Sequence, residues 1–377
     1  MLRNIAICSK QNKNSLTNFD YIHRLEMNGF PVFCGLLYSP ERKFSNQVEE
    51  NNYRVLVRKK AFSCNYRDKA LIFRIAKQAI ESEDIFFAVG SDFVAEVIDI
   101  GAKVTELKIG DRVIGNNAYP DADIEGVKPG IPSNHGSKEY QIFHQTKLIK
   151  VPPQMSDTEA AAFSIGAQTS YSVVRKFNPS RGANILITAA KSNTSLFVIN
   201  ALKKYGVNIY ATTTSELFVE ELKAMGVKEV IVVDKKPNSL LENQSIQTIF
   251  EATGGFDCVF DPFFDIYLAQ SVQLMKFNAK YITCGLYDQY FDLIGKEFTT
   301  TDANLSKLIG LVMMKNLQII GNCLGTREDL QNALEDYVSG NLKVTIDSVF
   351  TGKQVGGFLD RTYNAGDRFG KVVYQYS

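Results

Sequence analysis

The chain has 377 residues, of which 45% are hydrophobic and 22% are charged, and its formal net charge is +1. This length is enough for two domains with separate cores, and the balanced charge argues against a nucleic acid or an anionic membrane as partner. No apolar run is long enough to span a membrane, and we expect no signal peptide, because the N-terminal residues lack an apolar core and a cleavage site. The six cysteines are scattered, which predicts reduced thiols in a cytoplasmic protein rather than a disulfide framework.

The first half of the chain is predicted to be rich in β-strands, at 53–64, 85–115 and 141–151. In the second of these segments apolar and polar residues alternate, as they do in a half-buried strand. Gly110 is followed by Asp111, a pair typical of hairpin turns. The loop 116–138 is long and rich in Pro, Gly and Asp, so it either lines a substrate site or is a surface excursion.

From residue 157 the pattern changes to alternating strands and helices. A helix is expected over 157–177, with Ser156 or Asp157 as its N-cap. The strands that follow are predicted at 184–188, 207–212, 229–233, 257–261, 280–284 and 317–323. The helices between them are predicted at 194–205, 215–225, 265–277 and 303–315. This alternation predicts a parallel sheet with helices on both faces. A helix at 327–339 and strands at 343–350 and 371–376 complete the chain.

The segment 85–115 reads IFFAVGSDFVAEVIDIGAKVTELKIGDRVIG. Its order of residues resembles the medium-chain dehydrogenase/reductase superfamily, whose catalytic domain carries a G-H/S-E/D strand followed by a G-D-x-V hairpin. The resemblance covers roughly 53–377 and implies an α/β fold with two domains. The first would be a β-rich GroES-like catalytic domain made of 1–150 with 325–377. The second would be a Rossmann-type cofactor domain with a doubly wound parallel sheet, at 151–324.

Zinc-dependent members of this family carry a cysteine and a histidine as metal ligands, and both are replaced here. Asn65 stands at the cysteine position when Asp68 is aligned with the family motif, and Ser91 stands at the histidine position. Neither is a good zinc ligand, so we expect no metal and assign the chain to the zinc-independent branch of quinone oxidoreductases and enoyl reductases. Without a Lewis acid the substrate oxygen needs hydrogen-bond donors, so Asn65, Tyr66 and Asp68 are the predicted catalytic residues. Alternatively, Tyr66 is a packed aromatic residue and Asp68 caps a helix over 69–77.

A nucleotide-binding fold needs a tight loop between its first strand and the following helix, where backbone amides hold the pyrophosphate. The family uses glycines there, but this loop has none. Small and hydroxyl-bearing residues take their place, so the loop is still expected to bind a dinucleotide. Its predicted cofactor-binding residues are Ala190, Lys191, Ser192, Asn193, Thr194 and Ser195.

The end of the next strand distinguishes NAD from NADP, because an acidic residue there binds the ribose diol of NAD. Thr213 stands at this position, followed by Thr214 and Ser215, so NADPH is favoured over NADH. Weaker matches to the family predict further cofactor contacts at Thr169, Gly285, Leu286, Leu324 and Lys371.

Together these expectations describe a zinc-independent, NADPH-dependent reductase. Hydride would pass to an α,β-unsaturated carbonyl compound, an enoyl thioester or a quinone. A homodimer is expected through the apolar edge strand 317–320, because such an edge would be a liability if it were left exposed. The alternative is a non-catalytic or non-redox protein on the same fold, because the cofactor loop has lost its glycines.

Overall fold

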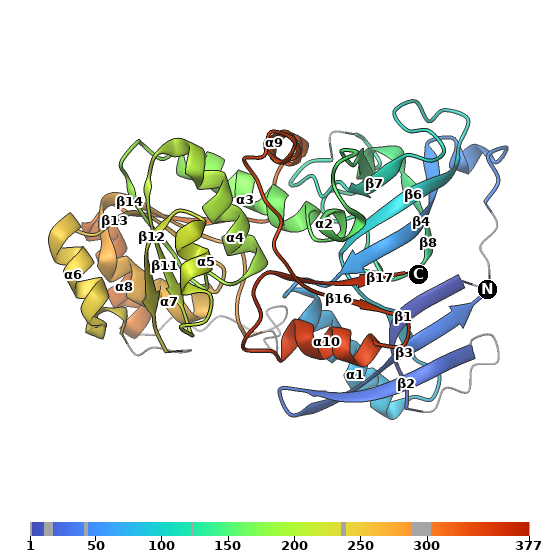
Figure 1. Cartoon of the computed structure of the whole chain (residues 1–377), viewed down its shortest axis with the longest axis horizontal. Helices are drawn as coiled ribbons and strands as arrows, with labels where there is room; N and C mark the ends of the chain where they lie inside the picture. The colour runs from blue at the N-terminus through green and yellow to red at the C-terminus, as the bar shows by residue number, and fades with distance from the viewer. Residues whose placement is uncertain are drawn as a thin grey trace. The chain divides into compact units, whose positions relative to one another are not determined.

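The computed structural model describes residues 2–10, 18–40, 44–122, 124–234, 239–288 and 303–376. The chain divides into two compact units (Figure 1). The first consists of Met1–Gln168, Leu324–Val338 and Val344–Ser377, and the second consists of Thr169–Cys323 and Ser339–Lys343. The C-terminal part of the chain therefore returns to the first unit.

The first unit is built mainly from strands. They are β1 (Leu2–Cys8), β2 (Asn18–Met27), β3 (Phe30–Ser39), β4 (Arg54–Ser63), β5 (Phe86–Ala88), β6 (Asp92–Ile100), β7 (Arg112–Gly115), β8 (Tyr140–His144), β9 (Leu148–Lys150), β16 (Ile346–Thr351) and β17 (Lys371–Gln375). One sheet has the order β2-β3-β1-β5, and the larger sheet has the order β16-β17-β4-β6-β7-β9, with β8 paired to β4. The helices of this unit are α1 (Asp68–Glu81), α2 (Asp157–Ala161), α9 (Arg327–Val338) and α10 (Val355–Tyr363).

One hydrophobic core joins the two sheets of the first unit. It contains Ile5 of β1, Phe62 of β4, Phe93 of β6 and Phe358 of α10, all fully buried. The predicted turn between β6 and β7 depends on Gly101, where a Cβ atom would come within 1.7 Å of a backbone oxygen of Asn51. A glycine is required there because the two backbones approach so closely.

The second unit is a parallel sheet with connecting helices. Its strands are β10 (Asn184–Ile187), β11 (Asn208–Thr213), β12 (Val227–Val232), β13 (Phe256–Asp261), β14 (Met275–Thr283) and β15 (Gln318–Gly321). Their order is β12-β11-β10-β13-β14-β15, and all five pairings are parallel in the described part of the chain. The helices are α4 (Asn193–Leu202), α5 (Val219–Ala224), α6 (Gln244–Thr253), α7 (Phe264–Leu274), α8 (Ala303–Met314) and most of α3 (Ser164–Phe177). This is the doubly wound order, in which ligands bind at the carboxyl ends of the strands where the order reverses, here between β10 and β13.

Several elements differ from the sequence prediction: strands β1, β2 and β3 were not predicted, and β14 begins at Met275, where the predicted helix 265–277 was still expected. The helix expected over 157–177 is divided into α2 and α3. Ser156 caps α2 in a capping box with Glu159, as one of the two predicted alternatives had it. Helix α6 was not predicted, although its signals are present: Asn243 accepts hydrogen bonds at its start, and Gly254 ends it with φ +71°.

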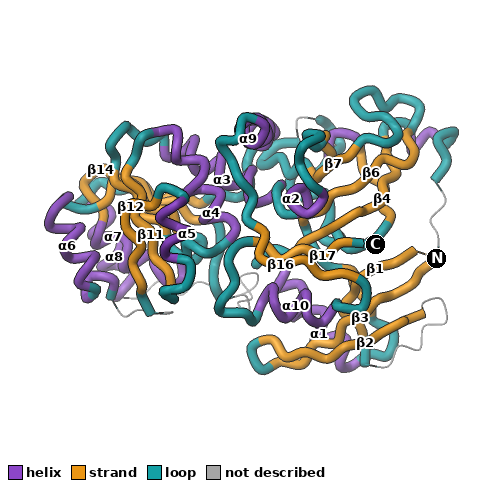
Figure 2. The backbone as a smooth tube through the Cα atoms, viewed as in Figure 1, coloured by secondary structure: helices purple, strands orange, loops and turns teal. Residues whose placement is uncertain are grey.

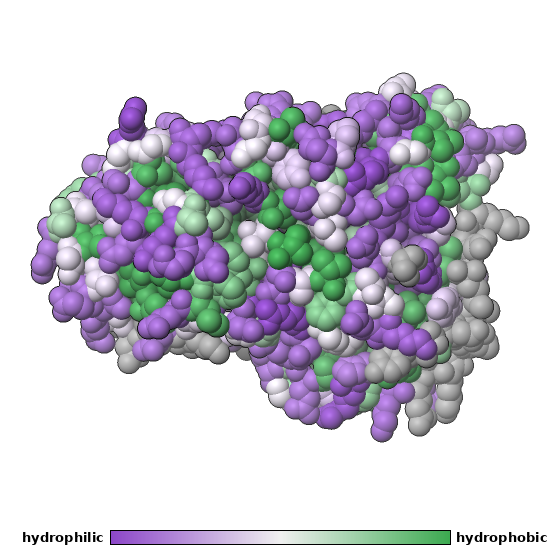
Figure 3. All heavy atoms as spheres, in the orientation of Figure 1, coloured by the Kyte–Doolittle hydropathy of each residue, from purple (hydrophilic) through white to green (hydrophobic). Residues whose placement is uncertain are grey.

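Figure 2 contrasts the strand-rich first unit with the helix-lined sheet of the second. On the face drawn in Figure 3, hydrophilic side chains are spread over both units and hydrophobic patches lie among them. Among the described residues, no helix has the length and apolar character needed to cross a membrane.

Candidate functional site

Five polar side chains meet in the first unit in what we call the Asn65 network: Asn65, Asp68, Ser91, Asp92 and Lys371. Asn65 follows β4, Asp68 begins α1, Ser91 and Asp92 lie at the start of β6, and Lys371 begins β17. They meet because β4 pairs with both β6 and β17. All but Asn65 are at most 4% exposed, so any charge here must find its partner inside the protein.

The side-chain amide of Asn65 lies at the centre of the network. Its Nδ2 donates to Ser91 Oγ at 3.0 Å and to Asp92 Oδ2 at 2.8 Å. Its Oδ1 accepts from Lys371 Nζ at 2.5 Å, and the same ammonium lies 3.3 Å from Asp92 Oδ2. Both amide hydrogens of Asn65 are therefore engaged within the protein, and neither is left for a substrate oxygen in this arrangement.

The carboxylate of Asp68 is also satisfied internally. Oδ2 accepts from the backbone N of Asn65 at 2.9 Å and from Ser91 Oγ at 2.7 Å, and Oδ1 pairs with Arg67 at 2.8 Å. Burial raises the pKa of Asp68, and the Arg67 charge opposes this shift. The alternative that Asp68 caps a helix at 69–77 is wrong in position, since α1 begins at Asp68 itself and Arg67 occupies the capping position.

Among the predicted catalytic residues, Tyr66 is less buried than Asp68. It is half-buried, and the ammonium of Lys69 lies 5.4 Å from the centroid of its ring. The neighbouring Cys64 is buried, and burial raises the pKa of its thiol well above the ordinary value. Cys64 is therefore held as a neutral thiol and not as a reactive thiolate.

In the second unit, the predicted cofactor loop follows β10 and leads into α4. Ala189 has φ +47°, a left-handed conformation that favours glycine. Ser192 caps the helix by accepting from Ser195 N at 3.2 Å, and Ser195 Oγ donates to Thr188 O at 3.0 Å. Hydroxyl hydrogen bonds thus hold the loop in the tight turn that glycines would otherwise permit.

The structure divides the predicted cofactor residues into accessible and inaccessible side chains. Half-buried and open to contact are Lys191, Ser192, Asn193 and Thr194. Fully buried are Ala190 and Ser195. Their burial leaves them no side-chain surface for a nucleotide, and Ser195 Oγ is engaged with the carbonyl of Thr188. Thr169 is 5% exposed, so it too offers little side-chain surface.

At the end of β11 the structure turns one of the predicted cofactor residues, Thr213, away from the surface. Thr213 is 2% exposed, and its hydroxyl donates to the carbonyl of Ser215 at 3.2 Å. Thr214 is exposed instead. The hydroxyl available to a nucleotide at this strand end is therefore that of Thr214, and Ser215 is half-buried beside it.

A buried carboxylate that the sequence prediction did not select supports the same end of the sheet. Asp261, the last residue of β13, accepts from Thr188 Oγ1 at 2.7 Å and from Tyr281 OH at 2.5 Å. Burial raises its pKa to about 6. Asp261 thus joins β10, β13 and β14 at their carboxyl ends. In the sequence, the position of Asp261 at a predicted strand end beside Pro262 was the feature that could have indicated this role.

Gly285 and Leu286 follow β14. A Cβ atom at Gly285 would lie 3.0 Å from the carbonyl oxygen of Pro262, and the carbonyl of Gly285 accepts from Phe264 N at 3.3 Å. Gly285 therefore keeps β14 close to the start of α7, and Leu286 beside it is half-buried.

The long loop 116–138 is anchored within the first unit. Lys147 Nζ donates to the carbonyls of Lys128 and Gly130, at 3.0 and 2.5 Å. Tyr119 N donates to Gly325 O at 3.0 Å, which brings the loop beside the predicted cofactor residue Leu324. These contacts fix the position of the loop within the first unit; Asp123 lies outside the described residues.

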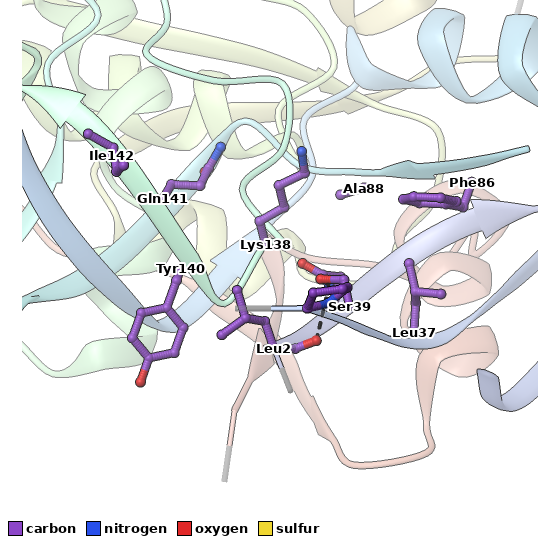
Figure 4. Close-up of a pocket in the computed structure, with 11 residues that line it drawn as sticks. Leu2, Leu37, Ser39, Phe86, Ala88, Lys138, Tyr140, Gln141 and Ile142 are labelled. Atoms are coloured by element: carbon purple, nitrogen blue, oxygen red, sulfur yellow. Dashed lines mark hydrogen bonds between the residues drawn. The ribbon is translucent and has the colours of Figure 1, made fainter. Parts of the chain in front are cut away.

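A cavity of about 270 Å³ opens elsewhere in the first unit (Figure 4). Residues of β1, β3, β5 and β8 line it, among them Leu2, Ser39, Phe86 and Tyr140. In Figure 4 the side chains of Lys138 and Gln141 extend to the same side of the cavity, and Tyr140 points away from them. No residue of the Asn65 network lines this cavity, so it is separate from the candidate site.

Two family models match the chain. Residues 51–153 match the alcohol dehydrogenase GroES-like domain, and residues 194–339 match the zinc-binding dehydrogenase domain. The chain belongs to the medium-chain dehydrogenase/reductase superfamily. Its α/β fold, with a GroES-like domain and a Rossmann domain, is confirmed.

Two of the matching relatives are named as an oxidoreductase-like protein and a reductase. A quinone oxidoreductase-like protein 2 homolog of Nematostella vectensis is 26% identical, over 83% of this chain and 79% of the relative. An acryloyl-coenzyme A reductase of Metallosphaera sedula is 24% identical, over 68% of this chain and 74% of the relative. The crystal structure of an NAD-dependent alcohol dehydrogenase shares the fold, with a TM-score of 0.75, 20% identity and 100% coverage of both chains. These comparisons support an oxidoreductase of this superfamily.

The name of the second family model implies zinc, but the Asn65 network does not suit it. Among the described residues, no group of three or more His, Cys, Asp or Glu side chains could hold a metal ion. In the network, the ammonium of Lys371 already pairs with Asp92, and it would repel a dication. Amide and hydroxyl groups at Asn65 and Ser91 do not replace thiolate and imidazole as zinc ligands.

Proposed function

We propose that this chain is a zinc-independent, NADPH-dependent reductase of α,β-unsaturated carbonyl compounds, enoyl thioesters or quinones. The observation that carries the proposal is the Asn65 network, a closed set of hydrogen bonds at the two positions where zinc-dependent members are expected to carry ligands. The names of two relatives, a quinone oxidoreductase-like protein and an acryloyl-coenzyme A reductase, agree with this substrate range.

The residues of the second unit fit a dinucleotide at the carboxyl end of its sheet. The half-buried side chains of Lys191, Asn193 and Thr194 surround the N-terminus of α4, where amides and the helix dipole favour a pyrophosphate. Thr214 offers a hydroxyl to a 2′-phosphate, and Thr213 stands at the position where NAD-binding members carry an acidic residue, although the exposed carboxylate of Glu216 follows three positions later. When bound, NADPH supplies the hydride.

The first unit supplies the polar groups that act on the substrate. Because Asn65 and Asp68 are engaged with each other and with their neighbours, they orient the segment that follows β4. Tyr66 carries the phenol of this segment, and its hydroxyl would stabilise charge on the substrate oxygen or deliver a proton.

The first test is a titration of the purified protein with NADPH and with NADH, followed by nucleotide fluorescence. We expect NADPH to bind more tightly. Thr214→Asp should reverse this preference, because a carboxylate repels the 2′-phosphate and accepts from the ribose diol. Thr248→Asp adds the same charge on the exposed face of α6 and should leave the preference unchanged. Failure of both nucleotides to bind would support the alternative, a non-redox protein on the same fold.

The second test concerns zinc. After mild dialysis, elemental analysis should find far less than one zinc per chain. Stoichiometric zinc that resists dialysis and supports turnover would contradict the proposal, because it would require ligands other than those of the Asn65 network.

We also propose that the protein is a homodimer. Strand β15 forms the edge of the sheet, and Ile319 on it is 40% exposed. On α8, Leu305, Ile309 and Met313 are spaced four residues apart and are at least 50% exposed. Exposed edge strands and exposed apolar stripes are surfaces that natural proteins usually cover, and a second copy that pairs with β15 edge to edge would cover the strand.

A further inference from the structure

The ring of Tyr66 lies against a buried lysine. Lys69 is 4% exposed, and its Nζ lies 5.4 Å from the ring centroid of Tyr66 and 5.6 Å from that of Phe73. The same ammonium donates to Asn28 Oδ1 at 3.3 Å, in the turn between β2 and β3. A cation at this distance from an aromatic face is attracted to it, more strongly when water is excluded.

The position of Lys69 follows from the face that α1 buries. Lys69, Ile72, Phe73 and Ala76 are all buried on this helix. Phe73 packs edge-on against Phe30 of β3, at 6.4 Å between centroids. The lysine thus lies between the helix and the β2–β3 hairpin, and its ammonium faces the rings of Tyr66 and Phe73.

Lys69 is one of the cations whose charge acts on Tyr66, and Arg368 is another. Asp68 on the same helix is bound to Asn65, Ser91 and Arg67. From the segment before β17, Arg368 interacts electrostatically with Tyr66 and with Tyr363.

The remaining neighbours of this segment are neutral. Tyr363 on α10 donates its hydroxyl to the carbonyl of Asn65 at 3.1 Å, and the pKa of Tyr363 is raised well above its ordinary value, chiefly by burial. Cys64, at the end of β4, is likewise kept neutral by burial. The charges acting on Tyr66 from these elements are therefore mainly positive.

We propose that Tyr66 is the acid that protonates the substrate. Lys69 would position the Tyr66 ring and stabilise the phenolate that remains after proton transfer. The inference rests on the proposed reductase function. After hydride has reached the β-carbon, the electron pair of the enolate forms a C–H bond at the α-carbon. The O–H bond of Tyr66 breaks and the carbonyl is restored. The phenolate that remains is stabilised by the Lys69 ammonium and is reprotonated by water.

The test that needs no substrate is the titration of Tyr66. The ultraviolet absorbance of the wild type minus that of Tyr66→Phe, recorded against pH, gives the midpoint for this one phenol. The same difference is then measured in a Lys69→Met background. Removing a cation so close should raise the midpoint by roughly one to two pH units. Lys69→Arg should keep it near the wild-type value, and Lys77→Met, on an exposed part of α1, should not move it.

The second readout is the pH profile of kcat/KM with NADPH and an enone or enoyl thioester. Tyr66→Phe should lower kcat by about 10²–10³-fold with little change in KM. Lys69→Met should lower kcat by less and should move the alkaline limb of the profile to higher pH. If Lys69→Met is poorly folded, Lys69→Gln takes its place in both measurements.

Equal titration midpoints in the wild type and in Lys69→Met, in a protein that binds NADPH, would overturn the inference. Full activity of Tyr66→Phe would do the same. Failure of the proposed function itself would look different: the wild type would bind neither nucleotide, whatever the midpoint of Tyr66. A shifted midpoint in such a protein would overturn the catalytic role assigned here to Tyr66.

Discussion

Replacing Lys371 with Met would test whether the Asn65 network stabilises the first unit. In the native protein, Lys371 is 3% exposed and Asp92 is fully buried. The substitution keeps an unbranched side chain of similar length but removes the ammonium. It leaves the Asp92 charge without its cation, and it leaves Asn65 Oδ1 without the donor at 2.5 Å.

The expected loss of stability follows from what Asp92 retains. Removing one partner of a buried ion pair typically costs about 3–5 kcal/mol. Asp92 still accepts from Asn65 Nδ2 at 2.8 Å and from Ile165 N at 2.9 Å, and hydrogen bonds to a charged group contribute about 1.5–3 kcal/mol each. We therefore expect a loss near the lower end, about 3 kcal/mol.

The assay is urea unfolding followed by circular dichroism, with Lys223→Met as control. Lys223 pairs with Glu220 at 2.9 Å, but both side chains are largely exposed, so this loss should stay within about 0.5 kcal/mol. The double variant Lys371→Met with Asp92→Asn removes both charges and should lose less than the sum of the single losses. A loss below about 1 kcal/mol for Lys371→Met, or strict additivity in the double variant, would refute the reasoning.

Three further predictions concern other parts of the chain. Ala189→Gly should leave the free energy of unfolding unchanged or slightly raised, because relief of the left-handed conformation, about 1 kcal/mol, offsets the entropy cost of glycine. Ala190→Gly, at a fully buried position, should lower the free energy of unfolding by about 1 kcal/mol, and thermal unfolding measures both. Burial lowers the pKa of Lys59 well below its ordinary value. Between that lowered pKa and the ordinary pKa the unfolded chain binds more protons, so the free energy of unfolding should rise with pH, by up to about 1.4 kcal/mol per unit. Lys59→Met should remove this slope in urea unfolding at several pH values, and an unchanged slope would contradict the prediction. Ile319→Lys should convert the proposed dimer into a monomer in light scattering, while Leu217→Lys, also at an exposed apolar position of the second unit, should not; a monomeric wild type would contradict the dimer.

The sequence by itself determined the family and most of the fold, although not the strands β1, β2 and β3. The alternation of apolar and polar residues in 85–115 identified the strands β6 and β7, and the βα alternation after residue 157 identified the parallel sheet. These signals are local, because side-chain period and turn residues are set within a few positions along the chain. The replacement of zinc ligands at Asn65 and Ser91 could also be read directly from the motif.

Only the tertiary structure decided what these residues do together. Lys371, predicted as a cofactor contact, lies 306 positions from Asn65 in sequence and yet donates to its amide. Thr213, predicted to face the nucleotide, turns its hydroxyl to the local backbone. No local pattern encodes such partners, since the pairing of β17 with β4 and of β4 with β6 brings the side chains into one buried space. Once they are there, the cost of burying an unpaired polar group determines which hydrogen bonds form.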